Sequence, residues 1–274
     1  MRGFVRVASF AALLGLSAHV ALAGDLKLTG DISEGGLVLG ATEPGAVVSL
    51  DGKPLRLTPD GKFVFGFNRD AEKVATLDVT YPDGTKDHRV LDVARTKYKI
   101  QRINGLPEKF VSPNKEQLAR IARENGQIVK ARDKDIDGSW FAEKFIWPAK
   151  GPISGVFGSQ RILNGEPRAP HTGLDIAVPI GTVLRAPAGG VVSLAQPGFY
   201  LTGGTLMIDH GHGLSSVFIH LSKIDVKVGQ VVKQGQRLGL TGATGRVTGP
   251  HVHWGLYWFD NRLDPQRLVP RKPQ

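Results

Sequence analysis

Glycine-rich turns recur at short intervals along this sequence and limit the length of the elements between them. Glycine accounts for 35 of the 274 residues. The segments between the turns, such as GAVVSL, GKFVFGF and HVHWGLYWF, are short and either alternating or apolar. Such runs, separated by turn residues, are typical of antiparallel sheets. The sequence therefore predicts a mainly β protein, and its length allows two domains with hydrophobic cores.

The first predicted unit is a small β-sandwich-like domain over residues 24–100. Its runs are separated or followed by Asp51-Gly52, Asp60-Gly61 and Asp83-Gly84, dipeptides that suit tight turns because glycine tolerates a positive φ. His88 stands alone in a polar stretch and is expected to be a solvated surface residue. We interpret this unit as an interaction or spacer domain.

Residues 101–139 are predicted to be a helical linker. Ser112 and Pro113 suit the N-cap and the first position of a helix. Apolar residues then follow at helical spacing despite Gly126, namely Leu118, Ile121, Ala122, Ile128 and Val129. We therefore expect one helix, over roughly 113–132, to join the two domains.

Residues 140–274 return to short β-like segments separated by glycines and are predicted to form a second, antiparallel β domain. Six of the eight histidines lie in this unit, from His171 onward. Candidate chemistry is therefore concentrated in the C-terminal half of the chain.

The first 23 residues have the pattern of a secretory signal peptide. Arg2 and Arg6 accompany a short apolar run that ends in Ala21-Leu22-Ala23, a small-x-small cleavage pattern. An uncleaved membrane anchor is the alternative, but His19 interrupts the run and no second stretch approaches the ~20 apolar residues of a spanning helix. We expect an exported protein, located in the periplasm or cell envelope or secreted, with no integral membrane span after cleavage.

The chain is basic and contains no cysteine. Its formal net charge is +10, and because Arg2 and Arg6 supply two of these charges, the cleaved chain would carry +8. Such a charge on an exported protein favours anionic envelope polymers or lipid surfaces over nucleic acid, and it equally fits a merely soluble basic surface. Without cysteine there is neither a disulfide nor a lipid-modified cysteine.

The stretch GPHVHWGLYW places His251 and His253 two positions apart. On a strand both imidazoles would lie on the same side, roughly 7 Å apart along the strand axis. From spacing alone they could be two metal ligands, two catalytic groups, one of each, or ordinary strand residues.

The stretch PHTGLDIAVPIGT adds His171 and Asp175, with Gly173 and nearby prolines that disfavour a helix. An extended or looped path would put these two side chains at separations that one metal ion can close. A carboxylate and two histidines would leave a fourth position of zinc open to water, as in catalytic zinc sites. Without cysteine, any tight transition-metal site here must use nitrogen and oxygen ligands.

Three further histidines are candidates in this half. His220 follows apolar residues at the end of an apparent strand, where a hydrogen-bonded core or edge histidine is the alternative. His210 and His212 form a rival pair, but the glycines that flank the second histidine favour a mobile hairpin turn over metal ligation.

Three motifs, HTGLDIA, FIHLS and GPHVHWGL, occur in this order in a glycine-rich β domain. They resemble the M23 family of zinc metallopeptidases, the lysostaphin and LytM-type peptidoglycan endopeptidases. The resemblance covers roughly residues 147–265 and includes connecting segments such as GTVLRAPAGGVV and the closing LDP. It implies a compact antiparallel β fold with Zn²⁺ in a groove. The N-terminal domain and helix resemble the leading region of proteobacterial members, without a diagnostic motif.

The resemblance also implies roles for five residues. His171 and Asp175 match the metal-binding HxxxD pair, and His253 matches the third zinc ligand. His251 and His220 match the catalytic pair, with the choice of base between them left open. The sequence has no HExxH motif, so a histidine would replace the glutamate base of other zinc peptidases.

A zinc metalloendopeptidase that hydrolyses peptide bonds in peptidoglycan stems or cross-bridges is the function that this resemblance implies. The first alternative is a non-catalytic relative that binds the cell wall or activates another peptidoglycan hydrolase, although all five motif positions are intact. A plain carbohydrate- or protein-binding β module is the second alternative, and it would leave those residues unexplained.

Two expectations concern the surroundings of the implied groove. Arg161, Asn164 and Tyr200 are candidates for lining it, with exposed loop positions as the alternative. The length of the linker permits an autoinhibitory contact in which the N-terminal domain covers the groove, and equally permits that domain to stay clear.

Overall fold

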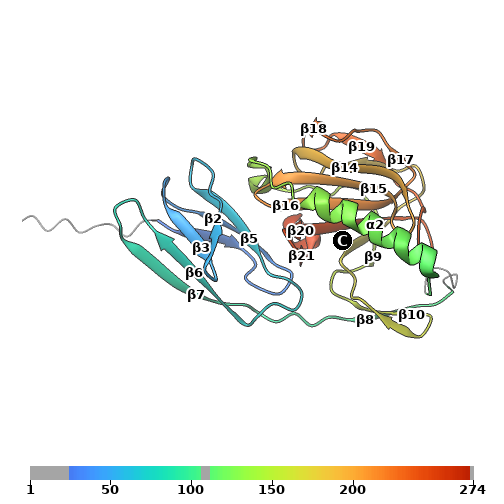
Figure 1. The fold of residues 1–274 in the computed structure, drawn as a ribbon, viewed down its shortest axis with the longest axis horizontal. Coiled ribbons are helices and arrows are strands. Elements are labelled where there is room, and N and C mark those ends of the chain that lie inside the picture. Colours follow the sequence, from blue (N-terminus) through green and yellow to red (C-terminus); the bar gives the residue numbers. More distant parts are fainter. Residues whose placement is uncertain (1–24, 106–111, 272–274) are drawn as a thin grey trace, which may run out of the picture.

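The protein is described by a computed structural model that covers residues 25–105 and 112–271. Figure 1 shows an N-terminal group of strands beside a larger C-terminal sheet. The mainly β fold class, with one long helix between the two groups, is confirmed. The predicted signal peptide, residues 1–23, lies outside the described residues. None of the described helices is both long and apolar enough to span a bilayer.

The N-terminal strands form two antiparallel sheets around a shared apolar core that includes Phe63, Phe65 and Leu77, none of them exposed. The Asp51-Gly52 turn joins two strands directly, and both residues have the positive φ angles, 49° and 73°, that a two-residue hairpin loop requires. One sheet has the order β1 (Lys27–Gly30), β2 (Leu37–Ala41), β5 (Lys62–Gly66); the other has the order β4 (Lys53–Leu55), β3 (Val47–Leu50), β6 (Val74–Thr80), β7 (Lys86–Asp92).

The C-terminal domain is built on one eight-stranded sheet in which every pair is antiparallel. Its order is β18 (Val231–Val232), β14 (Gly190–Phe199), β15 (Gly203–Gly211), β16 (Leu214–Leu221), β20 (His251–Trp258), β12 (Gly173–Ala177), β9 (Ile153–Gly155), with β21 (Asn261–Leu263) also paired to β20. The domain also contains a small sheet of β13 (Val183–Arg185), β19 (Arg237–Leu240) and β17 (Lys223–Ile224) and the short helices η1 (Trp140–Ala142) and η2 (Pro265–Leu268).

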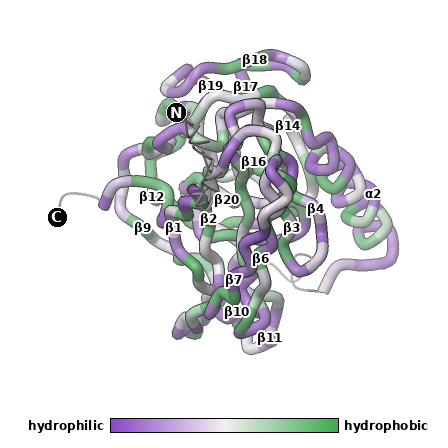
Figure 2. Tube along the Cα trace, turned by 90° about the vertical axis from the view of Figure 1, so that its left-hand side faces the viewer, coloured by the Kyte–Doolittle hydropathy of each residue, from purple (hydrophilic) through white to green (hydrophobic). Residues whose placement is uncertain are grey.

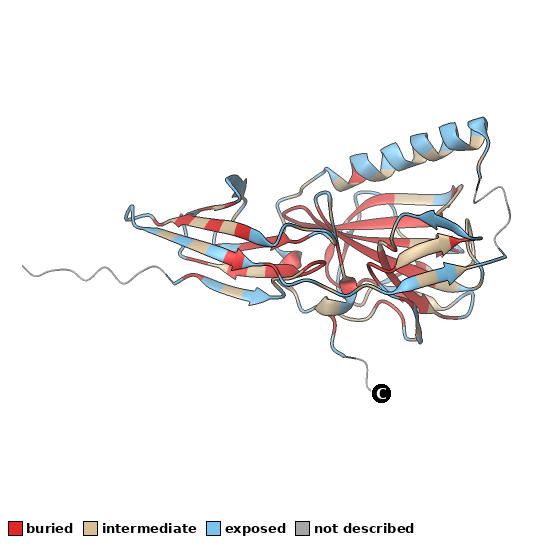
Figure 3. Ribbon diagram, turned by 90° about the horizontal axis from the view of Figure 1, so that it is seen from below, coloured by how far each residue is buried: buried red, intermediate tan, exposed pale blue. Residues whose placement is uncertain are grey.

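The two faces of this sheet have different environments. Along β20, Val252 and Trp254 point into the main apolar core, whereas Tyr257 belongs to a second, smaller cluster. Because side chains alternate along a strand, His251 and His253 share the face of Tyr257. Helix α2 (Lys115–Arg132) packs Ala131 into that smaller cluster. Figure 3 shows that the outer side of this helix is exposed.

The linker differs from its prediction at two points. Helix α2 confirms the helix expected over roughly 113–132, but its N-cap is Asn114 and not Ser112. The Asn114 side chain accepts from the Gln117 backbone at 2.9 Å, and the Gln117 side chain accepts in return. Figure 2 shows hydrophobic and hydrophilic residues alternating along α2.

The start of the predicted linker, before the helix, contains a strand that was not predicted. Residues of β8 (Ile100–Ile103) pair in parallel with β10 (Gln160–Leu163), which also pairs with β11 (Glu166–Arg168). Isolated four-residue strands have too short a pattern to be recognised from periodicity. This pairing attaches the beginning of the linker to the C-terminal domain.

Candidate metal centre

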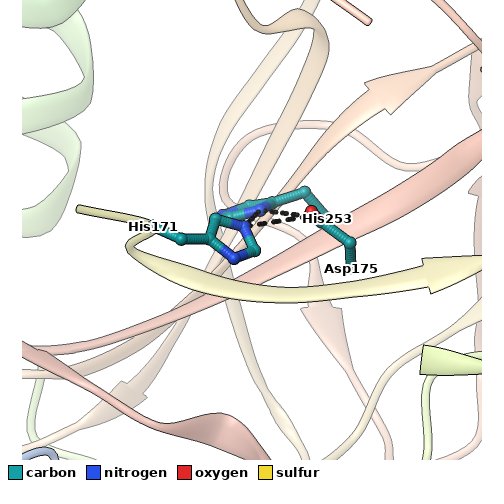
Figure 4. Close-up of side chains that lie close together, drawn as sticks. All are labelled: His171, Asp175 and His253. Carbon is teal, nitrogen blue, oxygen red and sulfur yellow. Dashed lines mark hydrogen bonds and ion pairs between the residues drawn. The ribbon is translucent and has the colours of Figure 1, made fainter. Parts of the chain in front are cut away.

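Two adjacent strands and the loop before them bring three predicted ligand residues together. Asp175 on β12 lies directly opposite His253 on β20, so both side chains extend from the same face of the sheet. His171 lies four residues before Asp175, ahead of β12. One ligating atom from each residue lies within 4.8 Å of the other two, and Figure 4 shows the three side chains meeting.

The ligating atoms converge on a common point. His171 Nε2 lies 2.9 Å from His253 Nδ1 and 3.0 Å from Asp175 Oδ1, and His253 Nδ1 lies 2.8 Å from the same carboxylate oxygen. His171 donates its Nδ1–H to the carbonyl of Val156 at 3.0 Å, which leaves the Nε2 lone pair directed at the centre. The set of two imidazoles and one carboxylate fits a metal ion that accepts nitrogen and oxygen ligands.

Electrostatics keep these groups in their ligating forms. Burial alone would raise the pKa of Asp175, but hydrogen bonds with His171 and His253 outweigh it and hold that pKa well below its usual range. Burial lowers the pKa of His253 to about 4, against the opposing effect of Asp175. At neutral pH the centre therefore contains a carboxylate anion and a neutral imidazole, the protonation states that metal binding requires.

Two glycines leave enough space for these side chains. A Cβ on Gly155 would lie 2.3 Å from Asp175 Oδ2, and one on Gly173 would lie 2.7 Å from His253 Nε2. In the sequence Gly155 has no distinguishing feature, and Gly173 indicates only that a helix is disfavoured. Neither has the positive φ that marks a turn glycine, and in a sequence this rich in glycine nothing distinguishes them.

The predicted catalytic histidines, His220 and His251, lie next to the three ligand residues. Their ring centroids are 4.8 Å apart, and His251 Nε2 is 3.8 Å from Asp175 Oδ1. His220 donates Nδ1–H to the carbonyl of Thr244 at 2.8 Å, and His251 donates its own to Gly249 at 2.9 Å. Each ring therefore keeps a lone pair on Nε2.

Burial, followed by the proximity of His251 and His253, lowers the pKa of His220 to about 3. This histidine has a positive φ of 67°, which is uncommon for a residue other than glycine and turns its side chain out of the strand pattern at the end of β16. His220 is thus neutral at physiological pH, with the lone pair of its Nε2 unprotonated.

A pocket of about 290 Å³ opens over these groups. Gln101 and Ile103 from β8 and Asn125 from α2 contribute to its wall, so part of the predicted linker surrounds the site. No described residue of 25–99 lines it. The remaining lining residues are Ser154, Arg161, Leu163, Asp175, Leu201, Thr202, Ile219, His220, Arg246, Val247, Thr248, His251 and His253.

Of the three residues suggested for the groove wall, Arg161 lines the pocket, while Asn164 and Tyr200 are absent from the described lining. Arg246 was not anticipated. Its position depends on the loop between β19 and β20, whose path over the sheet cannot be inferred from local sequence.

The other histidines lie apart from this centre. His210 is not in a mobile turn: it is fully buried in β15 and bonded to the carbonyl of Gly189 and to Ser216 Oγ. His212 does occupy the turn after β15, with a φ of 50°, but it is 3% exposed and packed against Phe141. Tertiary packing therefore overrides the glycine signal here. His88 is exposed as predicted and paired with Asp78.

Comparisons with known proteins identify relatives of this chain. The family model described as Peptidase family M23 matches residues 169–265. The peptidoglycan DD-endopeptidase ShyA of Vibrio cholerae is 33% identical over 219 residues, which are 74% of this chain and 50% of that protein. The DD-carboxypeptidase/endopeptidase Mpg of Neisseria meningitidis is 42% identical over 101 residues, 36% of this chain and 22% of that protein. The chain thus spans half or less of the length of these curated relatives.

A solved structure matches a larger share of this chain than these two relatives do. A crystal structure from Pseudomonas aeruginosa assigned to peptidase M23 superposes with a TM-score of 0.66 at 32% sequence identity. The match covers 87% of this chain and 95% of that one, so it includes the region N-terminal to the match with the family model. This chain therefore belongs to peptidase family M23.

Proposed function

We propose that this protein is a zinc-dependent endopeptidase that hydrolyses peptide bonds in peptidoglycan. The convergence of His171, Asp175 and His253 on one point, with two more histidines in the same pocket, is the observation that carries this proposal. The names of the relatives ShyA and Mpg, a peptidoglycan DD-endopeptidase and a DD-carboxypeptidase/endopeptidase, support the choice of substrate.

In this proposal His171, Asp175 and His253 hold the zinc ion. Two imidazoles and one carboxylate leave a fourth position free, which distinguishes catalytic from structural zinc sites. When bound, zinc makes a water molecule more acidic and polarises a substrate carbonyl. The Arg161 guanidinium, whose Nη2 lies 3.3 Å from Asp175 Oδ2, helps to orient the carboxylate.

His220 and His251 are the proposed catalytic residues. A backbone carbonyl fixes the Nδ1–H of each ring, so Nε2 is the nitrogen at which each can accept a proton. One of the two removes a proton from the attacking water. The imidazolium that results can then donate a hydrogen bond to the tetrahedral oxyanion and transfer its proton to the leaving amine.

We also propose export to the cell envelope, where peptidoglycan lies, with residues 1–23 as the signal. In this arrangement residues 24–100 are the N-terminal β domain, 101–139 the linker and 140–274 the peptidase domain. The net charge of the chain favours contact with an anionic polymer of the envelope.

A pair of histidine variants tests the proposed roles. We expect His253→Ala to lose zinc, measured by elemental analysis, together with hydrolysis of purified sacculi. His220→Ala should keep its zinc and lower the turnover number by roughly 10²- to 10⁴-fold, the usual contribution of a general acid or base. His88→Ala is the matched control, because this exposed histidine lies in the N-terminal domain.

A chelator should abolish hydrolysis, and added zinc should restore it. Full activity of either site variant would contradict the role assigned to that residue. A protein that binds zinc and sacculi but cleaves no muropeptide would instead be the non-catalytic cell-wall binder or activator.

A further inference from the structure

Two arginines lie in the pocket in addition to the proposed zinc ligands and catalytic histidines. Arg161 extends from β10, and Arg246 comes from the loop between β19 and β20. Both are partly buried, and the side chain of Arg161 is 23% exposed. Neither is needed to polarise an amide carbonyl, because that is the chemistry of the metal.

The charges of this pocket do not balance. Asp175 is the single acidic residue in its described lining, against two guanidinium groups, and a divalent ion bound by Asp175 would increase the positive excess. Burial, followed by the nearby charges of Arg161 and Arg168, lowers the pKa of Arg246, so these cations lie close enough to repel one another. Such an arrangement favours an anionic group in the pocket.

Both arginines are held by the framework of the site. The loop of Arg246 also contains Thr244, whose carbonyl accepts from His220 and whose hydroxyl donates to the carbonyl of Leu221 at 2.9 Å. The backbone N–H of Arg246 donates to the Leu201 carbonyl at 2.8 Å. The loop is therefore fixed relative to the proposed catalytic histidines.

Arg161 is held by strand pairing, because it lies opposite Gln101 of β8. Its Nε is buried and has no hydrogen-bond partner among the described residues. A carboxylate in the pocket would therefore meet the exposed part of this guanidinium, whose geometry it matches well.

We propose that Arg161 and Arg246 form a carboxylate-binding subsite, with Arg246 as its main contact. The preferred substrate is then a stem peptide with a free carboxylate close to the scissile bond, and uncharged glycine bridges are poor substrates. The pocket volume of about 290 Å³ is at the low end for ligand pockets, which places that carboxylate within about two residues of the bond. This inference rests on the proposed function and specifies its substrate.

Two synthetic substrates test the subsite: a cross-linked stem peptide with its carboxylates free, and the same peptide with those carboxylates amidated. Wild type should prefer the free acid. Arg246→Gln should lower kcat/KM for the free acid about 10- to 100-fold, mainly through KM, and change the value for the amide less than about twofold. Arg246→Lys should restore part of the loss, because it keeps the charge but not the bidentate geometry.

Two further measurements separate a binding role from a structural one. The zinc content of Arg246→Gln should equal that of wild type. The control variant Arg262→Gln removes the same charge from an exposed arginine on β21 and should leave the hydrolysis of both substrates unchanged. In the chelator-treated protein, calorimetry should detect the free-acid peptide binding more tightly than the amide, and this difference should disappear in Arg246→Gln.

The outcomes distinguish this inference from the function on which it rests. Equal losses on both substrates, or a wild-type enzyme that treats acid and amide alike, would overturn the subsite. A zinc-loaded wild type that hydrolyses neither peptide would overturn the proposed function, and the calorimetric comparison would still decide the subsite.

Discussion

At the scale of single residues, the site depends on positions where no side chain is present. A Cβ on Gly155 would lie 2.3 Å from Asp175 Oδ2 and 3.0 Å from His171 Cε1, so two proposed ligands would have to move. We expect Gly155→Ala to weaken zinc binding by 10- to 100-fold, the usual effect of disturbing the surroundings of a ligand. Competition with a chromogenic chelator measures this. Gly198→Ala is the control, because its added Cβ meets nothing within 4 Å; an equal loss in the control would refute the steric explanation.

A second prediction at this scale concerns His210, which is fully buried and neutral. Burial lowers its pKa from 6.5 to about 4, so between these pH values the unfolded chain binds a proton that the folded chain does not. The contribution of His210 to stability is therefore complete above pH 6.5 and falls as the pH drops towards 4, by roughly 1.4 kcal/mol per unit.

Urea unfolding at pH 7.5, 6 and 5 tests this titration. His210→Asn keeps a donor for the carbonyl of Gly189 but cannot titrate. It should be less stable than wild type at pH 7.5, and the difference should shrink as the pH falls. A constant difference across the three pH values would show that His210 does not titrate in this way.

At the scale of elements, helix α2 is attached to the C-terminal sheet mainly by polar contacts. Glu124 accepts from the backbone of Tyr200 at 2.7 Å, and Arg120 donates to the carbonyl of Gly198 at 3.0 Å. Gly126 lies inside the helix with open space around it. We expect Gly126→Ala to raise the free energy of unfolding by about 0.5–1 kcal/mol, since alanine is the better helix former.

Chemical denaturation followed by circular dichroism measures this change. The effect should appear in the main unfolding transition if α2 unfolds together with the sheet. An unchanged midpoint would contradict that coupling and would mean that the helix unfolds on its own.

Elements could be predicted from sequence where neighbouring residues determine them, and could not where contacts between distant segments do. Hairpin turns such as Asp51-Gly52 were predicted, because the positive φ angles at a two-residue turn depend on the residues in it. The ligand set His171, Asp175 and His253 was proposed from the resemblance of three motifs to a family, whereas strand periodicity alone indicated only that His251 and His253 share a face. The strand β8 and the burial of His210 could not be predicted, since both depend on segments distant in sequence, β10 and the Gly189 carbonyl. The place of Arg246 in the pocket could not be predicted for the same reason.

At the scale of the whole molecule, the two domains share one apolar core in the described residues. The buried cluster that contains Phe65 of the N-terminal domain also contains Leu263 of the C-terminal domain. Polar contacts reinforce this junction: Arg267 donates to Ser33 Oγ and, at 3.2 Å, to Thr96 Oγ1. A core that crosses a domain boundary couples the folding of both sides, because exposing one side removes packing from the other.

We therefore expect differential scanning calorimetry to show a single transition, with a van't Hoff enthalpy equal to the calorimetric enthalpy. Arg267→Ala should weaken the junction, lower the midpoint temperature and reduce the ratio of the two enthalpies, because the N-terminal domain can then unfold first. Arg262→Ala, an exposed arginine on the neighbouring strand β21, is the control and should leave the transition unchanged. Two resolved transitions in wild type would mean that the domains fold independently and that the shared core does not couple them.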